Sequence, residues 1–162
     1  MTAPAKTATR PAGTGTAYAD DFYIWTQEQG ARLRAGDLDA LDLENLAEEI
    51  ESLGKSQFGS LVSAWRVVLL HMLKFDHQPS RRTRSWVITI ATHRETAVDE
   101  LRDSPGLKGR VTEAMERAYR RARLEAADET GLPLKTFPET CPYTREEMLT
   151  RPFAIDPDDT TA

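Results

Sequence analysis

Apolar residues recur at spacings of three and four along most of the chain, and this spacing predicts amphipathic helices. No segment shows the strict alternation of apolar and polar residues that is typical of a half-buried strand. The pattern predicts five main helices, over residues 20–35, 43–53, 56–75, 86–103 and 107–130. The predicted fold class is therefore all-α.

Glycines and capping residues predict where these helices end. Gly36, Gly54 and Gly131 each follow a predicted helix, where a left-handed residue closes the last turn at little cost. The stretch "LPLKTFPETCPY" reads as an extended strap stiffened by prolines. After it, Thr144 and Glu147 have the spacing of a capping box, which predicts a short final helix.

The apolar pattern also predicts how the helices pack. The segment from Trp65 to Leu73 is apolar nearly all round, as expected of a central helix surrounded by others. In the segment "LENLAEEIESLG", the apolar residues fall on one face, which we expect to point inward: Leu43, Leu46, Ile50 and Leu53. The prediction is a single-domain helical bundle over residues 18–153, with a disordered leader at 1–17 and a frayed tail at 154–162.

Composition narrows the class of protein. A chain of 162 residues that is 40% hydrophobic and 29% charged fits one soluble globular domain. No apolar run approaches the ~20 residues that span a bilayer, so no membrane contact is expected. A single cysteine, Cys141, excludes an intrachain disulfide framework and fits the reducing cytoplasm. No cofactor is expected, because no cofactor-binding motif is present.

The net charge of −5 is unevenly spread. Residues 37–51 contain seven acids and no Lys or Arg, whereas residues 66–94 contain six bases and one acid, Asp76. Segments of opposite charge in one chain often face each other or water, so this asymmetry alone does not identify a nucleic-acid-binding protein.

One stretch nevertheless has features of a nucleic-acid contact. Arg81, Arg82 and Arg84 are bracketed by the aromatic residues Phe75 and Trp86, which supplies cations beside rings that could stack on bases. A pI near 5.3 argues against a basic nucleic-acid-binding domain. Nucleic acid is therefore a disfavoured partner, and a protein partner or a homo-oligomer is favoured.

Several charged residues interrupt the predicted apolar faces. Arg94 projects into the apolar sector of its helix, and an unpaired buried charge costs several kcal/mol. Glu49 flanks the apolar stripe of residues 43–53 and is the acid best placed to turn inward. We therefore expect a polar network of Glu49 with Arg94. Arg66, His71 and Glu129, which interrupt or extend apolar faces in the same way, are candidates to join it.

Metal and nucleophile chemistry receive little support. His71, His77 and His93 could supply ring nitrogens to a metal. None of them lies three or four residues from another histidine, or three residues after a glutamate, as metal ligands on a helix usually do. The chain also has no nucleophile-elbow motif, no phosphate-binding glycine loop and no paired Cys–His context. We predict no catalytic residues and no metal ligands.

Three stretches resemble a known family. They are "DLENLAEEIESLGKS", "LLHMLKFDHQPSRRTRSWVITIATHR" and "FPETCPY", and they resemble the bacterial domain of unknown function 29 family over roughly Tyr18 to Phe153. The resemblance implies a small all-helical bacterial domain with no assigned activity. The motif positions that it carries over are Glu48, Glu49, Glu51, His71, Lys74, Gln78, Pro79, Arg84, Ser85, Trp86, Arg94 and Glu129.

The leading hypothesis is a non-catalytic interaction or binding module of the bacterial cytoplasm, with a regulatory role. In this hypothesis the Glu/Arg network is mainly structural. The alternative is an enzyme or nucleic-acid-processing protein that uses Glu49, Glu129, His71 and Arg94 around a cleft. The candidate binding residues are Glu49, His71, Arg84, Trp86, Arg94 and Glu129.

Overall fold

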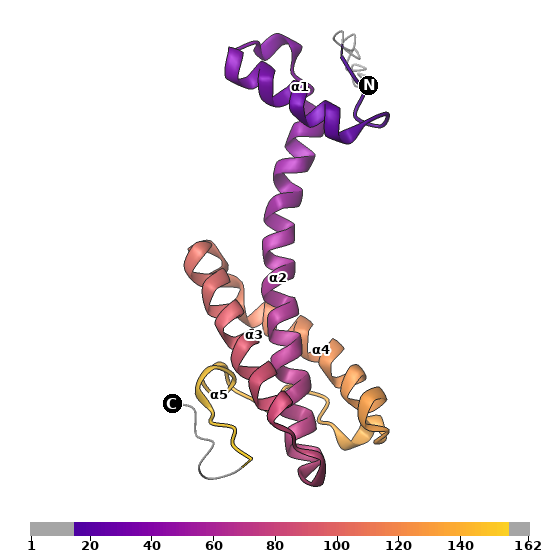
Figure 1. Cartoon of the computed structure of the whole chain (residues 1–162), viewed down its shortest axis with the longest axis vertical. Helices are drawn as coiled ribbons and strands as arrows, with labels where there is room; N and C mark the ends of the chain where they lie inside the picture. The colour runs from indigo at the N-terminus through magenta and orange to yellow at the C-terminus, as the bar shows by residue number, and fades with distance from the viewer. Residues whose placement is uncertain (1–14, 156–162) are drawn as a thin grey trace, which may run out of the picture. The chain divides into compact units, whose positions relative to one another are not determined.

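The computed structural model describes residues 15–155, and every regular element in that range is a helix, which confirms the all-α class. The α-helices are α1 (Phe22–Ala35), α2 (Leu43–His77), α3 (Arg84–Asp103), α4 (Val111–Thr130) and α5 (Arg145–Thr150) (Figure 1). Short 3₁₀ segments connect them: η1 (Leu38–Ala40), η2 (Pro79–Arg81), η3 (Pro105–Arg110) and η4 (Leu134–Thr136). Most of the predicted leader (1–17) and tail (154–162) lies outside the described residues.

The predicted helix ends are mostly confirmed. Gly36 and Gly131 have positive φ angles of 74° and 70° and end α1 and α4. Thr144 and Glu147 form the predicted capping box of α5. The predicted helix over 107–130 begins as the 3₁₀ segment η3 and becomes α-helical only at Val111.

The predicted break at Gly54 was wrong. Residues 43–53 and 56–75 form one helix, α2, of 35 residues, and Gly54 does not adopt a positive φ angle. A glycine in a helix interior costs only about 1 kcal/mol relative to alanine. A single glycine without a following proline or an alternative cap is therefore not enough to end a helix.

Contacts divide the chain into two compact units, Met1–Leu53 (the N-terminal unit) and Gly54–Ala162 (the C-terminal unit). In the described part of the N-terminal unit, residues 15–53, the buried side chains are Trp25, Gln29 and Leu41. Trp25 Nε1 donates to Asp42, and the Gln29 side chain accepts from the Asp42 backbone N–H. These bonds join α1 to the start of α2.

The prediction that Leu43, Leu46, Ile50 and Leu53 face inward was wrong for most of this stripe. Leu43, Ile50 and Leu53 are 59%, 68% and 69% exposed, and Leu46 is half-buried. The spacing correctly identified one apolar helix face. It could not show whether the same chain covers that face, because periodicity describes a helix and not its neighbours.

The hydrophobic core of the C-terminal unit confirms that the second half of α2 is central. Trp65, Val68, Leu69, Met72 and Leu73 are fully buried. They pack in one cluster with residues of α3, α4, α5 and the strap between α4 and α5, including Ile90, Ala118, Phe137 and Met148.

By length and composition alone, α2 could cross a membrane. Of the most apolar 18-residue stretch of α2, 67% is buried within the structure. Packing against other helices is therefore sufficient to explain why this helix is so apolar.

Candidate functional site

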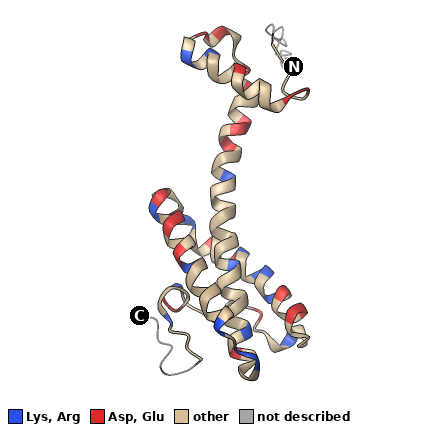
Figure 2. Ribbon diagram, in the orientation of Figure 1, with Lys and Arg blue, Asp and Glu red and all other residues tan. Residues whose placement is uncertain are grey.

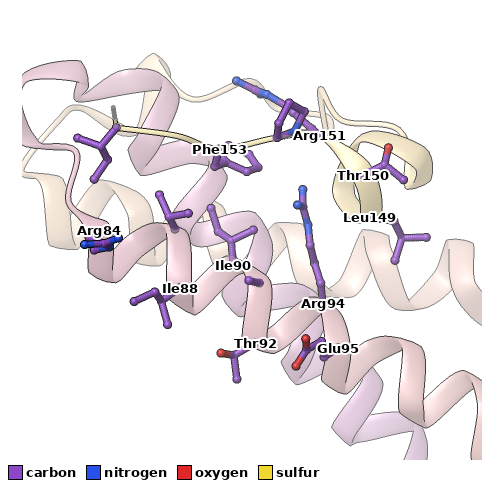
Figure 3. Close-up of a pocket in the computed structure, with 14 residues that line it drawn as sticks. Arg84, Ile88, Ile90, Thr92, Arg94, Glu95, Leu149, Thr150, Arg151 and Phe153 are labelled. Atoms are coloured by element: carbon purple, nitrogen blue, oxygen red, sulfur yellow. The ribbon is translucent and has the colours of Figure 1, made fainter. Parts of the chain in front are cut away.

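A groove in the C-terminal unit lies between α3 and the segment Leu149–Ile155 (Figure 3). Its volume is about 630 Å³, within the range of ligand-binding sites. Its apolar lining includes Val87, Ile88 and Phe153, and its charged lining consists of Arg84, Arg94, Arg151 and Glu95. The groove thus combines an apolar floor with an excess of positive charge.

Four of the residues by which α3 lines the groove lie along one side of this helix. Arg84, Ile88, Ala91 and Glu95 recur at spacings of four and three residues, which is the helical repeat. Ile88 is 57% exposed, so this stripe is not covered by the chain itself. A groove that follows a helix over three turns has the form of sites that receive another helix.

Arg94 crosses the groove from α3 to the C-terminal segment (Figure 3). Its Nε donates to the carbonyl oxygen of Met148 at 2.5 Å, and its Nη2 donates to that of Glu147 at 3.0 Å. Both carbonyls belong to the last turn of α5, and that of Glu147 also accepts from the Arg151 backbone N–H at 3.0 Å. Arg94 therefore fixes the position of α5, a structural role for a residue that the sequence identified as a misfit.

The charge of Arg94 is positioned but not neutralised. Both of its acceptors are neutral, and within residues 15–155 no carboxylate forms an ion pair with it. Burial and the nearby Arg151 lower the pKa of Arg94 below its ordinary value. A guanidinium has five N–H donors, so Arg94 keeps donors for an anion after these two bonds.

The opposite wall of the groove is held by Asp76 of α2. Arg151 donates to both carboxylate oxygens of Asp76, at 2.6 and 2.8 Å, and the Tyr143 hydroxyl donates to it at 2.8 Å. Burial opposes ionisation of Asp76, but the bonds from Arg151 and Tyr143 outweigh it, so the pKa of Asp76 lies below its ordinary value. These contacts tie the C-terminal segment to the core.

Sequence reasoning missed Asp76, Tyr143 and Arg151 as a group. The available signal was that Asp76 is the one acid among the bases of residues 66–94. Its partners lie 67 and 75 positions further along the chain, so no local spacing could pair them.

An aromatic pair connects this wall to α2. The Phe153 ring lies 5.0 Å from that of Phe75, edge to face. The guanidinium groups of Arg94 and Arg151 lie 5.1 and 4.9 Å from the Phe153 ring, within the range of cation–π contacts. Phe153 therefore supports both arginines from the floor of the groove.

Two ion pairs connect α2 to α4. Arg66 pairs with Glu125, and Lys74 Nζ lies 2.5 Å from Glu129. The sequence identified Arg66 and Glu129 as members of a polar network, and the structure gives each a partner on the facing helix. Glu129 is exposed and lies in an interhelical ion pair, not in the groove.

Glu49 and Arg94, the two partners of the expected pair, lie in different units, and each has a hydrogen-bond partner within its own unit. Glu49, half-buried in the N-terminal unit, accepts from the Tyr18 hydroxyl at 2.5 Å. This bond, with burial and the charge of Glu49, raises the pKa of Tyr18. Residues 43–53, which were predicted to form a separate helix, are instead the start of α2.

His71 of α2 is half-buried and donates from Nδ1 to the Val67 carbonyl oxygen at 2.9 Å, since a carbonyl can only accept. Burial is the main cause that lowers the pKa of His71 below its ordinary value. The folded protein therefore favours the neutral ring.

We expect stability to fall as the pH drops below 6.5, the ordinary histidine pKa, because the unfolded chain then binds a proton that folded His71 resists. Thermal melts across about pH 7.5 to 5.5 measure this slope. His71→Asn, which keeps a donor near Val67, should flatten this slope. His77→Asn is the matched control, because His77 is not among the groups that shift the pKa of His71. An unchanged slope in His71→Asn would contradict the assignment.

Three of the residues that suggested nucleic-acid binding, Phe75, Arg82 and Trp86, contact other residues of the chain. Arg82 donates to the Phe75 carbonyl oxygen at 2.8 Å and lies 4.1 Å from the Phe75 ring. Trp86 is half-buried, and Lys74 Nζ lies 4.7 Å from its ring. Arg84 is exposed and lines the groove. Neither aromatic ring is thus presented as an open platform for bases.

Of the four residues of the enzyme hypothesis, one, Arg94, lines the groove. Arg94 lies in the groove, Glu129 pairs with Lys74, and Glu49 accepts from Tyr18 in its own unit. Within residues 15–155, no three His, Cys, Asp or Glu side chains are grouped as a metal site requires. Of the six candidate residues, the groove brings together Arg84 and Arg94.

Comparison with known proteins agrees with the resemblance seen in the sequence. The model of the family described as domain of unknown function DUF29 matches residues 17–154. No curated protein and no solved structure matches the chain. Because the family model covers most of the chain, including both walls of the groove, the chain belongs to the DUF29 family of domains of unknown function.

Proposed function

We propose that this chain is a non-catalytic interaction module of the bacterial cytoplasm, and that its groove binds an acidic, amphipathic helix of a protein partner. The observation that carries the proposal is Arg94, a half-buried cation held by neutral carbonyls and not paired with a carboxylate within residues 15–155. An anion that enters the groove would supply the missing charge.

Other features support a protein ligand. The groove has an apolar floor, which a helix with leucine or isoleucine side chains could cover. Its long form along α3 matches a helix better than a compact metabolite.

The chemistry of Cys141 supports a non-catalytic role. Burial raises the pKa of the Cys141 thiol, which disfavours the thiolate that a cysteine nucleophile needs.

Two synthetic peptides test this function. One is an amphipathic helix of leucine and glutamate, and the other has lysine in place of glutamate. We expect the full chain to bind the Leu/Glu peptide in fluorescence anisotropy, with an affinity that falls as salt rises, and to bind the Leu/Lys peptide weakly.

Arg94→Met should weaken Leu/Glu binding by about tenfold or more, because hydrogen bonds to charged groups contribute about 1.5–3 kcal/mol each. Arg102→Met is the matched control, since Arg102 lies on the same helix but is 67% exposed and paired with Asp99 and Asp103. Equal losses in both variants, or equal binding of both peptides, would contradict the proposal.

A further inference from the structure

One wall of the groove continues directly into an acidic stretch of the chain. Ile155 lines the groove and is the last residue that the structure describes. The next seven residues, 156–162, read "DPDDTTA", with three aspartates and no Lys or Arg. We call residues 156–162 the acidic segment, which lies outside the described residues. The sequence thus places three negative charges within four residues of the groove wall.

Arg94 is the cation of the groove best suited to a carboxylate. Arg151 is already paired with Asp76, and Arg84 is exposed, so water weakens its attraction for an anion. Arg94 is half-buried and donates to two neutral carbonyl oxygens, without an ion pair within residues 15–155. Glu95 also lines the groove, but it is exposed, so water and salt screen its repulsion of an anion at Arg94.

We propose that the acidic segment binds in the groove of its own chain, with one of its aspartates at Arg94, and so competes with the acidic helix of a partner. This inference rests on the proposed function and names the regulation of the same site. The acidic segment has no large apolar side chain, so it pairs with Arg94 without covering Val87 and Ile88. An amphipathic helix meets both the charge and the apolar floor, and it can therefore displace the segment.

The acidic segment is long enough for this contact. At 1.5 Å per residue, the stretch of α3 from Arg84 to Glu95 that lines the groove extends about 17 Å. Asp159, four residues beyond Ile155, lies up to about 14 Å from it in an extended chain. The side chains of Asp159 and Arg94 cover the remaining distance.

The covalent link makes a weak contact sufficient. A segment joined to its binding site by a short linker has an effective concentration on the order of 1 mM. A contact with a Kd on the order of 1 mM would therefore be formed in about half of the molecules.

Neutralising the acidic segment in the full chain tests the proposal. The segment variant replaces its three acids and keeps its length: Asp156→Asn, Asp158→Asn and Asp159→Asn. The control variant removes three exposed acids elsewhere in the C-terminal unit, two of them on α4, whose acids are red in Figure 2, and none of them in the groove: Glu116→Gln, Asp128→Asn and Glu139→Gln. Both variants change the net charge equally, and circular dichroism should show that both are folded.

The first measurement needs no peptide. The Nε–H resonance of Arg94, identified by its loss in Arg94→Lys, should shift in the segment variant and stay in place in the control variant. High salt should move the wild-type resonance toward its position in the segment variant, since salt weakens the contact. An Arg94 resonance that is the same in the wild type and the segment variant would overturn the inference.

The second measurement is the affinity for the Leu/Glu peptide. The peptide should bind the segment variant about two- to tenfold more tightly than the control variant, because apparent affinity is reduced by the fraction of molecules whose groove is occupied. Equal affinities would overturn the inference, and binding that still depends on Arg94 would leave the proposed function intact. If the peptide bound neither variant, the proposed function would fail, and the Arg94 resonance alone would decide whether the acidic segment occupies the groove.

Discussion

Asp76→Asn should lower the free energy of unfolding by about 2–3 kcal/mol, because it weakens the hydrogen bonds from Arg151 and Tyr143 and leaves Arg151 without its charge partner. The side chains of Arg151 and Asp76 are 33% and 26% exposed. Water therefore reduces the loss below the ~3–5 kcal/mol that follows when a fully buried pair is broken. Chemical denaturation at neutral pH measures this difference.

The matched control is Asp99→Asn, which removes a partner of Arg102 in a pair that is 67% and 54% exposed. Exposed pairs contribute at most about 1 kcal/mol. If Asp76→Asn cost no more than Asp99→Asn, Asp76 would not be the anchor of the groove wall.

The effect of Asp76→Asn should also depend on pH. The pKa of folded Asp76 lies below its ordinary value of 3.8, so the contribution is complete well above pH 3.8. It is lost as the pH falls through the pKa of the folded protein. The stabilities of wild type and Asp76→Asn should therefore converge in acid.

Phe153→Ala should be at least as damaging, at about 3–4 kcal/mol, since truncation of a buried phenylalanine typically costs 3–5 kcal/mol. Phe153 is 6% exposed and packs against Phe75. The variant also removes the ring beside Arg94 and Arg151, so binding of the Leu/Glu peptide should fall with stability.

Hydrogen exchange can locate the effect of Phe153→Ala. The amides of α5 should lose protection first, because Phe153 lies just after that helix. Met148 is the one buried residue of α5 and packs the helix against the core. Phe153→Leu, which keeps much of the apolar volume, is the control and should cost less. Unchanged protection of α5 in Phe153→Ala would show that the ring does not hold the wall.

Most helix ends could be predicted from the sequence, because a helix cap depends on residues that are neighbours along the chain. The left-handed glycines Gly36 and Gly131 and the capping box at Thr144 satisfy backbone groups within one turn, so spacing alone reveals them. Gly54 carries the same local signal as a terminator. There the helix continued because the cost of an interior glycine is small.

The candidate site was less predictable, because it depends on contacts between distant segments. Wheel geometry identified Arg94 as a residue that needs partners, but those partners are backbone carbonyls, which have no signature in the sequence. Glu49 looked like a suitable partner because both lie beside apolar stripes. Its hydrogen bond with Tyr18 spans 31 positions, which no helical periodicity indicates.

Recognition of an acidic ligand by Arg94 in the groove can be observed at the arginine itself. The most direct test follows the Nε–H resonance of Arg94 by nuclear magnetic resonance while the Leu/Glu peptide is added, with Arg94→Lys used to assign the signal. We expect a saturable shift of the Arg94 resonance and no shift of the Arg102 resonance, since Arg102 lies on the same helix outside the groove. Binding of the peptide without any change at Arg94, or with equal changes at both arginines, would contradict this role of Arg94.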